Sequence, residues 1–365
     1  MRSLLAAALS LAAAVVPTAS AAPKMETLYV RPHGTIAAFA QDGPLIAWFA
    51  PSTTRCNTVH VLSLANGLQV HLPAQGSARN VTCRWDVMPP VGLALAGTSA
   101  LWTLRESAPI PFDWVVGAGV GDRKERRFQE IAHTNRGFGL WLGGLAGDRS
   151  TLVYAVTSVD YVDEAGCLAG TGSCELEVAG GGVYRVVGRQ PQQLVAGTDA
   201  AVAVAASGGD VAYIPTASIA KNGRPRAGAD LPIEVVDAHT GKLVSRVTPQ
   251  GTPLALALAP HVLATLERTP LGMRLAWYVR ATGAPSGSVP VASATSPELT
   301  ANDRLIVFRV GRSLRAVDVA THRVRTLGRA AAPPIGLSLE GGRLAWAENV
   351  KGGGRIRALY VGGRG

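Results

Sequence analysis

A two-strand pattern recurs seven times along this chain and constrains its fold more than any other feature. Each copy has a short strand of small apolar residues, a tight turn and a second strand that usually ends in an aromatic residue. The copies occupy residues 36–48, 93–102, 142–154, 201–213, 254–265, 298–308 and 336–346. They follow one another at intervals of roughly 40 to 60 residues, which is the period of the blades of a β-propeller. The repeat therefore predicts an all-β fold, a single β-propeller.

A second hairpin follows the first in the clearest repeats and completes a four-stranded blade. Residues 59–70, 233–244 and 314–324 alternate apolar and polar side chains around a turn, as paired strands do. Asn66–Gly67 and Thr240–Gly241 suit the positive φ that tight turns require. We expect seven blades, at residues 35–73, 91–131, 139–195, 200–249, 253–291, 297–328 and 335–361.

The last of these blades shows only three strands in the sequence. We expect the segment Glu26–Arg31 to supply the fourth strand and close the ring. Such closure removes an exposed sheet edge, which is a liability of open sheets. The segment Asp113–His133 is the least regular, and it leaves rings of six or eight blades as alternatives.

The N-terminus has the features of an export signal. Arg2 precedes an apolar run from Leu4 to Val16, and the small residues Ala19–Ala21 follow as a cleavage pattern. We therefore expect residues 1–22 to be a signal peptide and residues 23–365 to form the propeller of an exported protein, extracellular or in the cell envelope. The apolar run is shorter than the roughly 20 residues that span a bilayer. No second such run follows, so no transmembrane segment is expected after cleavage.

Basic residues outnumber acidic ones, and the formal net charge is +10. Such a charge is compatible with an anionic polymer as ligand. The Lys and Arg residues are nevertheless spread along the chain, and the densest run, Arg123–Arg127, has the character of a solvated turn. We expect no specific nucleic-acid binding and a monomeric protein. The abundance of Arg, Ala, Gly and Pro indicates a GC-rich, bacterial genome.

Four cysteines in an exported chain are expected to form disulfides. Three connectivities exist for four cysteines, and the local one joins Cys56 to Cys83 and Cys167 to Cys174. Both bridges would close loops on the same face of the ring. They are compatible with a binding role and equally with simple protection of long loops.

The connections between the strands are longer on one face of the ring than on the other. Connections from the second to the third strand of a blade, and from one blade to the next, emerge on the same face, here called the long-loop face. Its long segments are residues 51–57, 73–90, 106–111, 158–182, 216–232 and 268–273. Loops on a rigid scaffold carry binding, so this face is the predicted recognition surface. The predicted binding residues are Arg84, Trp85, Asp86, Tyr161, Lys221, Arg224 and Arg226.

Two groups of residues have side chains that could bind a metal. Asp160, Asp163 and Glu164 belong to an acidic cluster with Glu175 and Glu177, and oxygen ligands suit Ca²⁺. Their spacing does not match a D-x-D-x-D-G calcium loop, so a solvated acidic hairpin is the alternative and no cofactor is predicted. His60 and His71, expected as diagonal neighbours in the outer hairpin of the first blade, are predicted to pack rather than to bind a metal.

The hairpin motif carries a family resemblance. The Asp-x-x-Thr-Gly sequence at Asp237–Gly241 and the Gly turn before Leu344–Trp346 resemble the secreted propellers of the TolB-like, YVTN-like and quinoprotein-like groups. The resemblance covers nearly the whole mature chain and implies the fold alone. TolB carries an α/β domain before its propeller, whereas the first blade begins here near Ile36. Quinoprotein blades usually carry a Trp after the Gly turn, and Lys242–Val244 lacks it, which weighs against a quinone site.

The sequence contains no G-x-S-x-G elbow, H-E-x-x-H helix or P-loop. We therefore expect a binding module whose long-loop face binds a protein or a cell-envelope glycan. The alternative is a metal-dependent hydrolase of lactones or esters, with acidic and amide residues from several blades at the mouth of the central tunnel. A structural envelope protein without a ligand is the third hypothesis. Three or more carboxylates at the tunnel mouth would favour the hydrolase.

Overall fold

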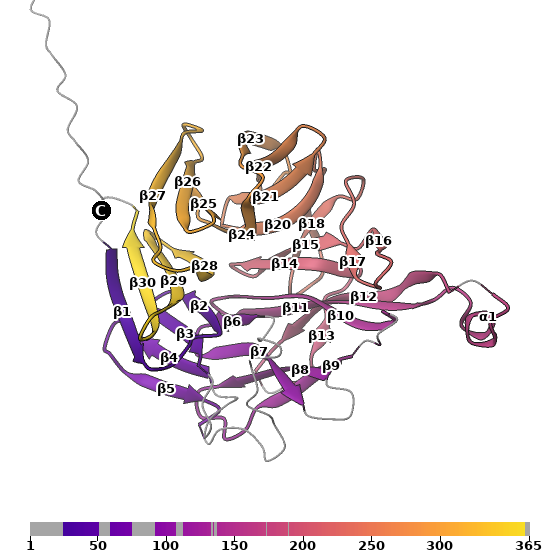
Figure 1. Ribbon diagram of the computed structural model, residues 1–365, viewed down its shortest axis with the longest axis horizontal. Coiled ribbons are helices and arrows are strands. Elements are labelled where there is room, and N and C mark those ends of the chain that lie inside the picture. The colour runs from indigo at the N-terminus through magenta and orange to yellow at the C-terminus, as the bar shows by residue number, and fades with distance from the viewer. Residues whose placement is uncertain are drawn as a thin grey trace, which may run out of the picture.

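The chain forms a ring of seven antiparallel sheets of four strands each, the blades of a β-propeller (Figure 1). The computed structural model describes residues 25–50, 59–74, 92–106, 112–132, 134, 137–172, 174–188 and 190–361. The first strands of successive blades lie side by side and surround the central axis. The prediction of an all-β propeller with seven blades is confirmed.

The strands follow the chain outward from the axis in six of the blades. The first two blades contain β2 (Ala38–Asp42), β3 (Leu45–Phe49), β4 (Val59–Ser63), β5 (Gln69–Leu72), β6 (Leu93–Ala96), β7 (Ser99–Glu106), β8 (Phe112–Gly119) and β9 (Arg126–Ile131). The third and fourth contain β10 (Gly139–Asp148), β11 (Thr151–Tyr161), β12 (Leu176–Val186), β13 (Gln193–Leu194), β14 (Ala201–Ser207), β15 (Asp210–Pro215), β18 (Ile233–Asp237) and β19 (Leu243–Val247). The fifth and sixth contain β20 (Thr252–Leu258), β21 (Val262–Thr269), β22 (Gly272–Val279), β23 (Pro285–Val291), β24 (Thr295–Ala301), β25 (Leu305–Val310), β26 (Ser313–Asp318) and β27 (Val324–Arg329).

The seventh blade joins the two ends of the described chain. It contains β28 (Ile335–Glu340), β29 (Arg343–Val350) and β30 (Gly353–Tyr360), and β1 (Met25–Pro32) pairs with β30 as its outermost strand. Figure 1 shows the indigo β1 beside the yellow β30. The predicted closure of the ring by the N-terminal strand is therefore confirmed, and it pairs an edge that β30 would otherwise expose.

The recurring aromatic residues of the second strands fill the space between blades. These side chains are at most 1% exposed, and they are Trp48, Trp102, Tyr154, Tyr213, Phe308 and Trp346. Trp48, for example, packs in one cluster with Ala345 and Ala358 of the neighbouring seventh blade. Burial of large aromatic surface stabilises strongly, and truncating such a residue to Ala costs about 3–5 kcal/mol. The aromatic period in the sequence thus reflects packing between sheets.

The outer hairpins confirm the expected pairing but correct one turn. The turn between β4 and β5 has four residues, because Ser63 N–H donates to Leu68 C=O and Gly67 N–H donates to Ser63 C=O. His60 and His71 are therefore direct partners, not diagonal neighbours, with ring centroids 4.7 Å apart. A two-residue turn would have moved the register by two positions.

The Asp-x-x-Thr-Gly motif works as a turn in the structure. Asp237 Oδ1 accepts hydrogen bonds from His239 N at 2.9 Å and Thr240 N at 2.7 Å. Gly241 follows with φ of 70°, and a Cβ there would lie 2.3 Å from the carbonyl oxygen of Ala196. The motif therefore determines the geometry of this turn.

Two insertions extend from the ring on the long-loop face. Between β11 and β12 the chain forms α1 (Glu164–Ala169), which lies away from the blades (Figure 1). We call residues 160–177 the finger. Between β15 and β18 the short strands β16 (Ser218–Ile219) and β17 (Pro225–Arg226) form a separate hairpin, here called the basic hairpin. No described helix is long and apolar enough to cross a membrane.

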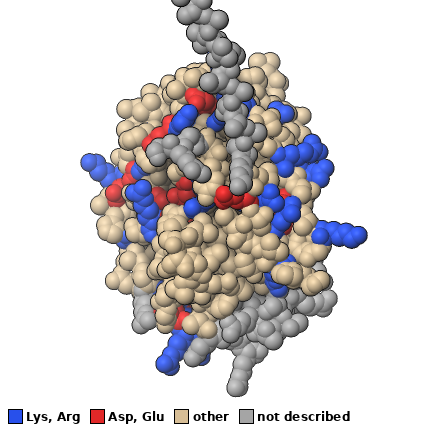
Figure 2. Space-filling view, turned by 90° about the vertical axis from the view of Figure 1, so that its left-hand side faces the viewer, with Lys and Arg blue, Asp and Glu red and all other residues tan. Residues whose placement is uncertain are grey.

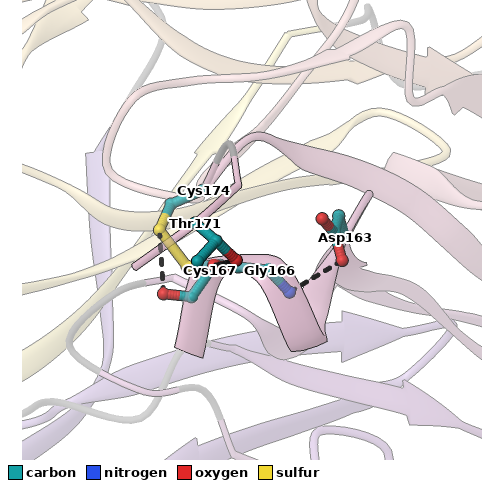
Figure 3. The surroundings of a disulfide bond; sticks show 5 residues. All are labelled: Asp163, Gly166, Cys167, Thr171 and Cys174. Atoms are coloured by element: carbon teal, nitrogen blue, oxygen red, sulfur yellow. Dashed lines mark hydrogen bonds between the residues drawn. A yellow bond between two sulfur atoms is a disulfide. The ribbon is translucent and has the colours of Figure 1, made fainter. Parts of the chain in front are cut away.

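The finger is closed by the predicted disulfide Cys167–Cys174, which the structure confirms (Figure 3). Asp163 caps α1, because its Oδ1 accepts a hydrogen bond from Gly166 N at 2.8 Å. Gly170 ends the helix in the left-handed conformation with φ of 71°. The predicted partners Cys56 and Cys83 lie outside the described residues.

Candidate functional site

The central tunnel has two mouths with different chemistry. The first strand of each blade starts on the long-loop face and ends at a tight turn on the opposite face. Cavities open at both ends, and residues at the strand starts line one while residues at the strand ends line the other. The two mouths are therefore built from different parts of the same repeat.

The mouth on the long-loop face holds a cavity of about 870 Å³. We call it the arginine cavity, because Arg224, Arg226 and Arg268 are among its lining residues and no described Asp or Glu is. The three arginines come from the basic hairpin and from the end of β21. Their side chains form no ion pair with any described carboxylate. Within the described part of the chain, the positive charge of these three arginines is therefore not balanced by an ion pair.

Backbone contacts fix the basic hairpin over the cavity. Ala220 N–H donates to Arg224 C=O, and Ala217 N–H donates to Arg226 C=O. Gly223 packs so closely on Gly137 that a Cβ at Gly223 would lie 2.2 Å from the Cα of Gly137. The backbone of the hairpin is thus held against the start of the third blade, at the mouth of the tunnel.

The wall of the arginine cavity is tied together across blades. Thr157 and Thr216 hydroxyls lie 2.7 Å apart in a hydrogen bond, and Thr157 Oγ1 donates to Ala201 C=O at 3.3 Å. Trp141 Nε1 donates to Gly137 C=O at 2.9 Å, which holds the indole at the rim. These bonds make a wall that exists without a ligand.

An unpaired strand edge lies on the same face. The outer strand β13 pairs only with Tyr184 and Arg185, so no described strand pairs with the outer edge of β12 over residues 176–182. Val162 N–H donates to Glu175 C=O, which by alternation turns the N–H and C=O of Leu176 and Val178 outward. Val178 is 36% exposed. Beside residues 178–181, a groove of about 410 Å³ separates this edge from the fourth blade.

The opposite mouth gathers carboxylates. Asp42, Asp148 and Glu340 end β2, β10 and β28, and each offers an oxygen within 4.8 Å of the others. Asp148 and Glu340 line a cavity of about 470 Å³. Within the described residues, Asp42, Asp148 and Glu340 are the only three acidic, His or Cys side chains that meet so closely. We call them the acidic triad.

Hydrogen bonds link the acidic triad to neighbouring turns. Asp42 Oδ2 accepts from Gly97 N at 2.5 Å and from Arg149 N at 3.0 Å, and Asp148 accepts from Gly208 N. Burial, followed by the charges of Asp42 and Asp148, raises the pKa of Glu340 to about 7. The triad therefore joins the turns of several blades and holds one carboxyl group that titrates near neutrality.

The predicted binding residues are found in different settings. Arg224 and Arg226 line the arginine cavity, and Lys221 is exposed in the same hairpin. Tyr161 is only 7% exposed and packs on Phe138, with ring centroids 5.1 Å apart. The predicted residues Arg84, Trp85 and Asp86 lie outside the described part of the chain.

The predicted metal candidates are not brought together. Asp163 caps α1, and Asp160 Oδ1 accepts from Tyr161 N at 2.8 Å. Asp160, Asp163 and Glu164 form no group of three close ligands in the described structure.

Sequence reasoning missed both Arg268 and the acidic triad. A signal for the triad was available, since each of its residues stands just before the turn in one of the seven repeats. Equivalent positions of a closed ring converge on the axis, so acids at that position in separate blades must approach one another. Arg268 is the penultimate residue of β21, next to a tight turn of Pro270 and Leu271, where a longer loop was expected.

Charge on the side of the ring formed by β1 and β30 is mixed. Figure 2 shows Lys and Arg side chains scattered there among Asp and Glu, without a continuous basic patch.

Comparisons with known proteins reach only the fold. No family model and no curated protein matches the chain. Among solved structures, the β-propeller domain of the Trilobed protease from Pyrococcus furiosus is 8% identical, with a TM-score of 0.53, over 89% of this chain and 95% of that chain. BamB from Moraxella catarrhalis is 9% identical, with a TM-score of 0.42, over 89% and 85% of the two chains. The computationally designed Ika8 protein is 14% identical, with a TM-score of 0.46, over 92% of this chain and 98% of that chain.

The Pyrococcus propeller is described as having an open velcro topology, whereas here β1 closes the last blade. By its sheets and by this likeness, the chain is a seven-bladed β-propeller.

Proposed function

We propose that the chain is an exported binding module whose long-loop face binds a protein partner. The observation that carries the proposal is the outer edge of β12, which no described strand pairs over residues 176–182, beside the groove on that face. A strand edge offers alternating N–H and C=O groups, and an extended peptide can pair with them as an added strand. A glycan has no such backbone. The edge therefore favours a protein over a cell-envelope glycan as the partner.

The sequence of the edge supports strand addition. Ala179 and Gly180 continue the edge after Val178 with small residues, so no large side chain there blocks the approach of a second backbone, whereas Gly181 and Gly182 already pack close to Ala200 and Leu194. A Cβ at Gly180 would meet nothing within 4 Å. Natural proteins usually cover or charge such edges to prevent unwanted pairing, and an edge left open in a rigid scaffold is suited to binding.

A selection from a library of unconstrained linear peptides tests the proposal. Binding of the selected peptides to the purified mature chain is measured by fluorescence anisotropy and compared with Val178→Pro. Proline removes the outward N–H of the edge, and we expect binding to weaken by about tenfold or more. Val324→Pro is the matched control, since Val324 starts an outer strand and also turns its N–H outward. Peptide binding that Val178→Pro leaves unchanged, or a bound glycan and no bound peptide, would contradict the proposal.

A metal-dependent hydrolase is the second candidate, and the acidic triad is the observation that favours it. Three carboxylates from separate blades at a tunnel mouth suit an oxygen-preferring cation such as Ca²⁺ or Mg²⁺. Asp42 already accepts two backbone N–H bonds through Oδ2, and a metal would have to use its other oxygen. Elemental analysis and thermal melts with and without chelator test this candidate. A stoichiometric metal whose removal lowers the melting temperature would support it and justify a screen of lactones and esters, and a metal-free chain with an unchanged melt would dismiss it.

A further inference from the structure

We infer that the arginine cavity binds carboxylate side chains of an acidic segment in the partner protein. This inference rests on the proposed function, because it assigns the chemistry of the partner on the same face. Arg224, Arg226 and Arg268 meet at one cavity from two elements of the chain. None of them has an ion-pair partner among the described residues, and the exposed Lys221 adds charge at the rim.

The chemistry of arginine selects the ligand class. A guanidinium group presents N–H donors in a planar fork that matches a carboxylate, and such charge-assisted bonds are stronger than neutral ones. The arginines lie on an exposed face rather than in the core, so a ligand carboxylate would not have to be buried completely. Several carboxylates, spaced along one ligand, are needed to neutralise three cations.

The rest of the lining favours a peptide over a sugar acid or a phosphate. Leu142, Val202 and Leu254 add apolar surface to the lining, which suits the aliphatic stem of a Glu side chain. Trp141 is the one aromatic residue of the lining, and its indole N–H is already bonded. A cavity of about 870 Å³ also exceeds what a single phosphate fills. An extended Asp- and Glu-rich segment fits all three features.

Fluorescence anisotropy with labelled hexaglutamate on the mature chain tests the inference. We expect saturable binding that weakens as salt rises, and a loss of about tenfold or more in Arg226→Gln and in Arg268→Gln. Arg323→Gln is the matched control, since Arg323 is an exposed arginine in a turn on the opposite face. It should leave binding unchanged. Parallel titrations with hexalysine, hexagalacturonate and inorganic phosphate distinguish the ligand classes.

Each other outcome overturns the inference. Equal loss in the cavity variants and in Arg323→Gln would show that general charge, not the cavity, binds the peptide. Binding of hexagalacturonate or phosphate without hexaglutamate would assign the cavity to another ligand class. If hexaglutamate fails to bind while selected peptides still depend on Val178, the acidic ligand is wrong and the protein-binding function stands. If the binding of the selected peptides also does not depend on Val178, both the acidic ligand and the protein-binding function are wrong.

Discussion

Arg280 of the fifth blade forms an ion pair with Asp210 of the fourth blade. Arg280 Nε donates to Asp210 Oδ2 at 3.1 Å, and its two terminal nitrogens donate to the carbonyls of Ser207 and Ala259, each at 3.1 Å. Arg280 is only 9% exposed. One side chain thus satisfies polar groups of two blades at the side of the ring where the turns are tight.

We expect Arg280→Met to lower the free energy of unfolding by about 3 kcal/mol, because it leaves a largely buried carboxylate and two carbonyls without their donor. Arg246→Met is the control, since Arg246 pairs with Glu234 but its side chain is 63% exposed. Its loss should stay below about 1 kcal/mol. Urea unfolding of both variants measures the difference, and equal losses would show that the bond between the blades contributes no more than a surface pair.

Closure of the ring by β1 gives a second prediction. A chain that begins at His33 lacks β1 and leaves β30 as an unpaired edge in the seventh blade. We expect a lower melting temperature and self-association, because the exposed edge can pair with another molecule. Size-exclusion chromatography with light scattering compares this chain with one that begins at Met25. A truncated chain that stays monomeric with an unchanged melt would show that β1 adds nothing to closure.

Glu340 makes stability depend on pH in an unusual direction. Its pKa rises from 4.5 to about 7 on folding, so the folded state holds this proton more tightly than the unfolded state. The resulting stability is fully present below about pH 4.5 and is lost as pH rises through about 7. Glu340→Gln keeps the neutral form at every pH.

We therefore expect Glu340→Gln to be more stable than the wild type at about pH 8, by roughly 1 to 2 kcal/mol after allowance for solvent screening. The advantage should disappear below about pH 4.5. Chemical unfolding at several pH values measures the difference in unfolding free energy between Glu340→Gln and the wild type directly. If this difference in unfolding free energy stays constant between about pH 4.5 and 8, the acidic triad does not control the titration of Glu340.

The fold was largely predictable from the sequence because each blade repeats the same local sequence pattern. The small first strand, the turn and the buried aromatic recur, and Trp48 and Trp346 mark equivalent positions in adjacent blades. The closing strand was predictable because the last blade lacked a partner at its edge. The four-residue turn before β5 was not, since Asn66–Gly67 also suits a two-residue turn and only the pairing of His60 with His71 decides between them.

The candidate site was only half predictable. Arg224 and Arg226 stand out as a basic run in a long connection, whereas Arg268 becomes part of the same cavity only through the ring. Arg226 and Arg268 are 42 residues apart in the sequence, and only the closed arrangement of the blades places them at the same cavity. Residues that lie close together at a propeller axis occupy equivalent positions in different blades, so they are found by comparing the repeats and not by their proximity in the sequence.

The disulfide of the finger should act locally. Cys167 and Cys174 are separated by seven positions, and the chain-entropy model gives roughly 2 to 3 kcal/mol for so short a loop. The finger lies away from the blades (Figure 1), so little of this stabilisation reaches the ring. In the double variant Cys167→Ser and Cys174→Ser we expect an unchanged global melt and faster hydrogen exchange in α1 and at the start of β12. Wild-type protein treated with a reductant should behave like the variant. A global melting temperature that falls together with the local protection would instead mean that the finger unfolds only with the whole ring.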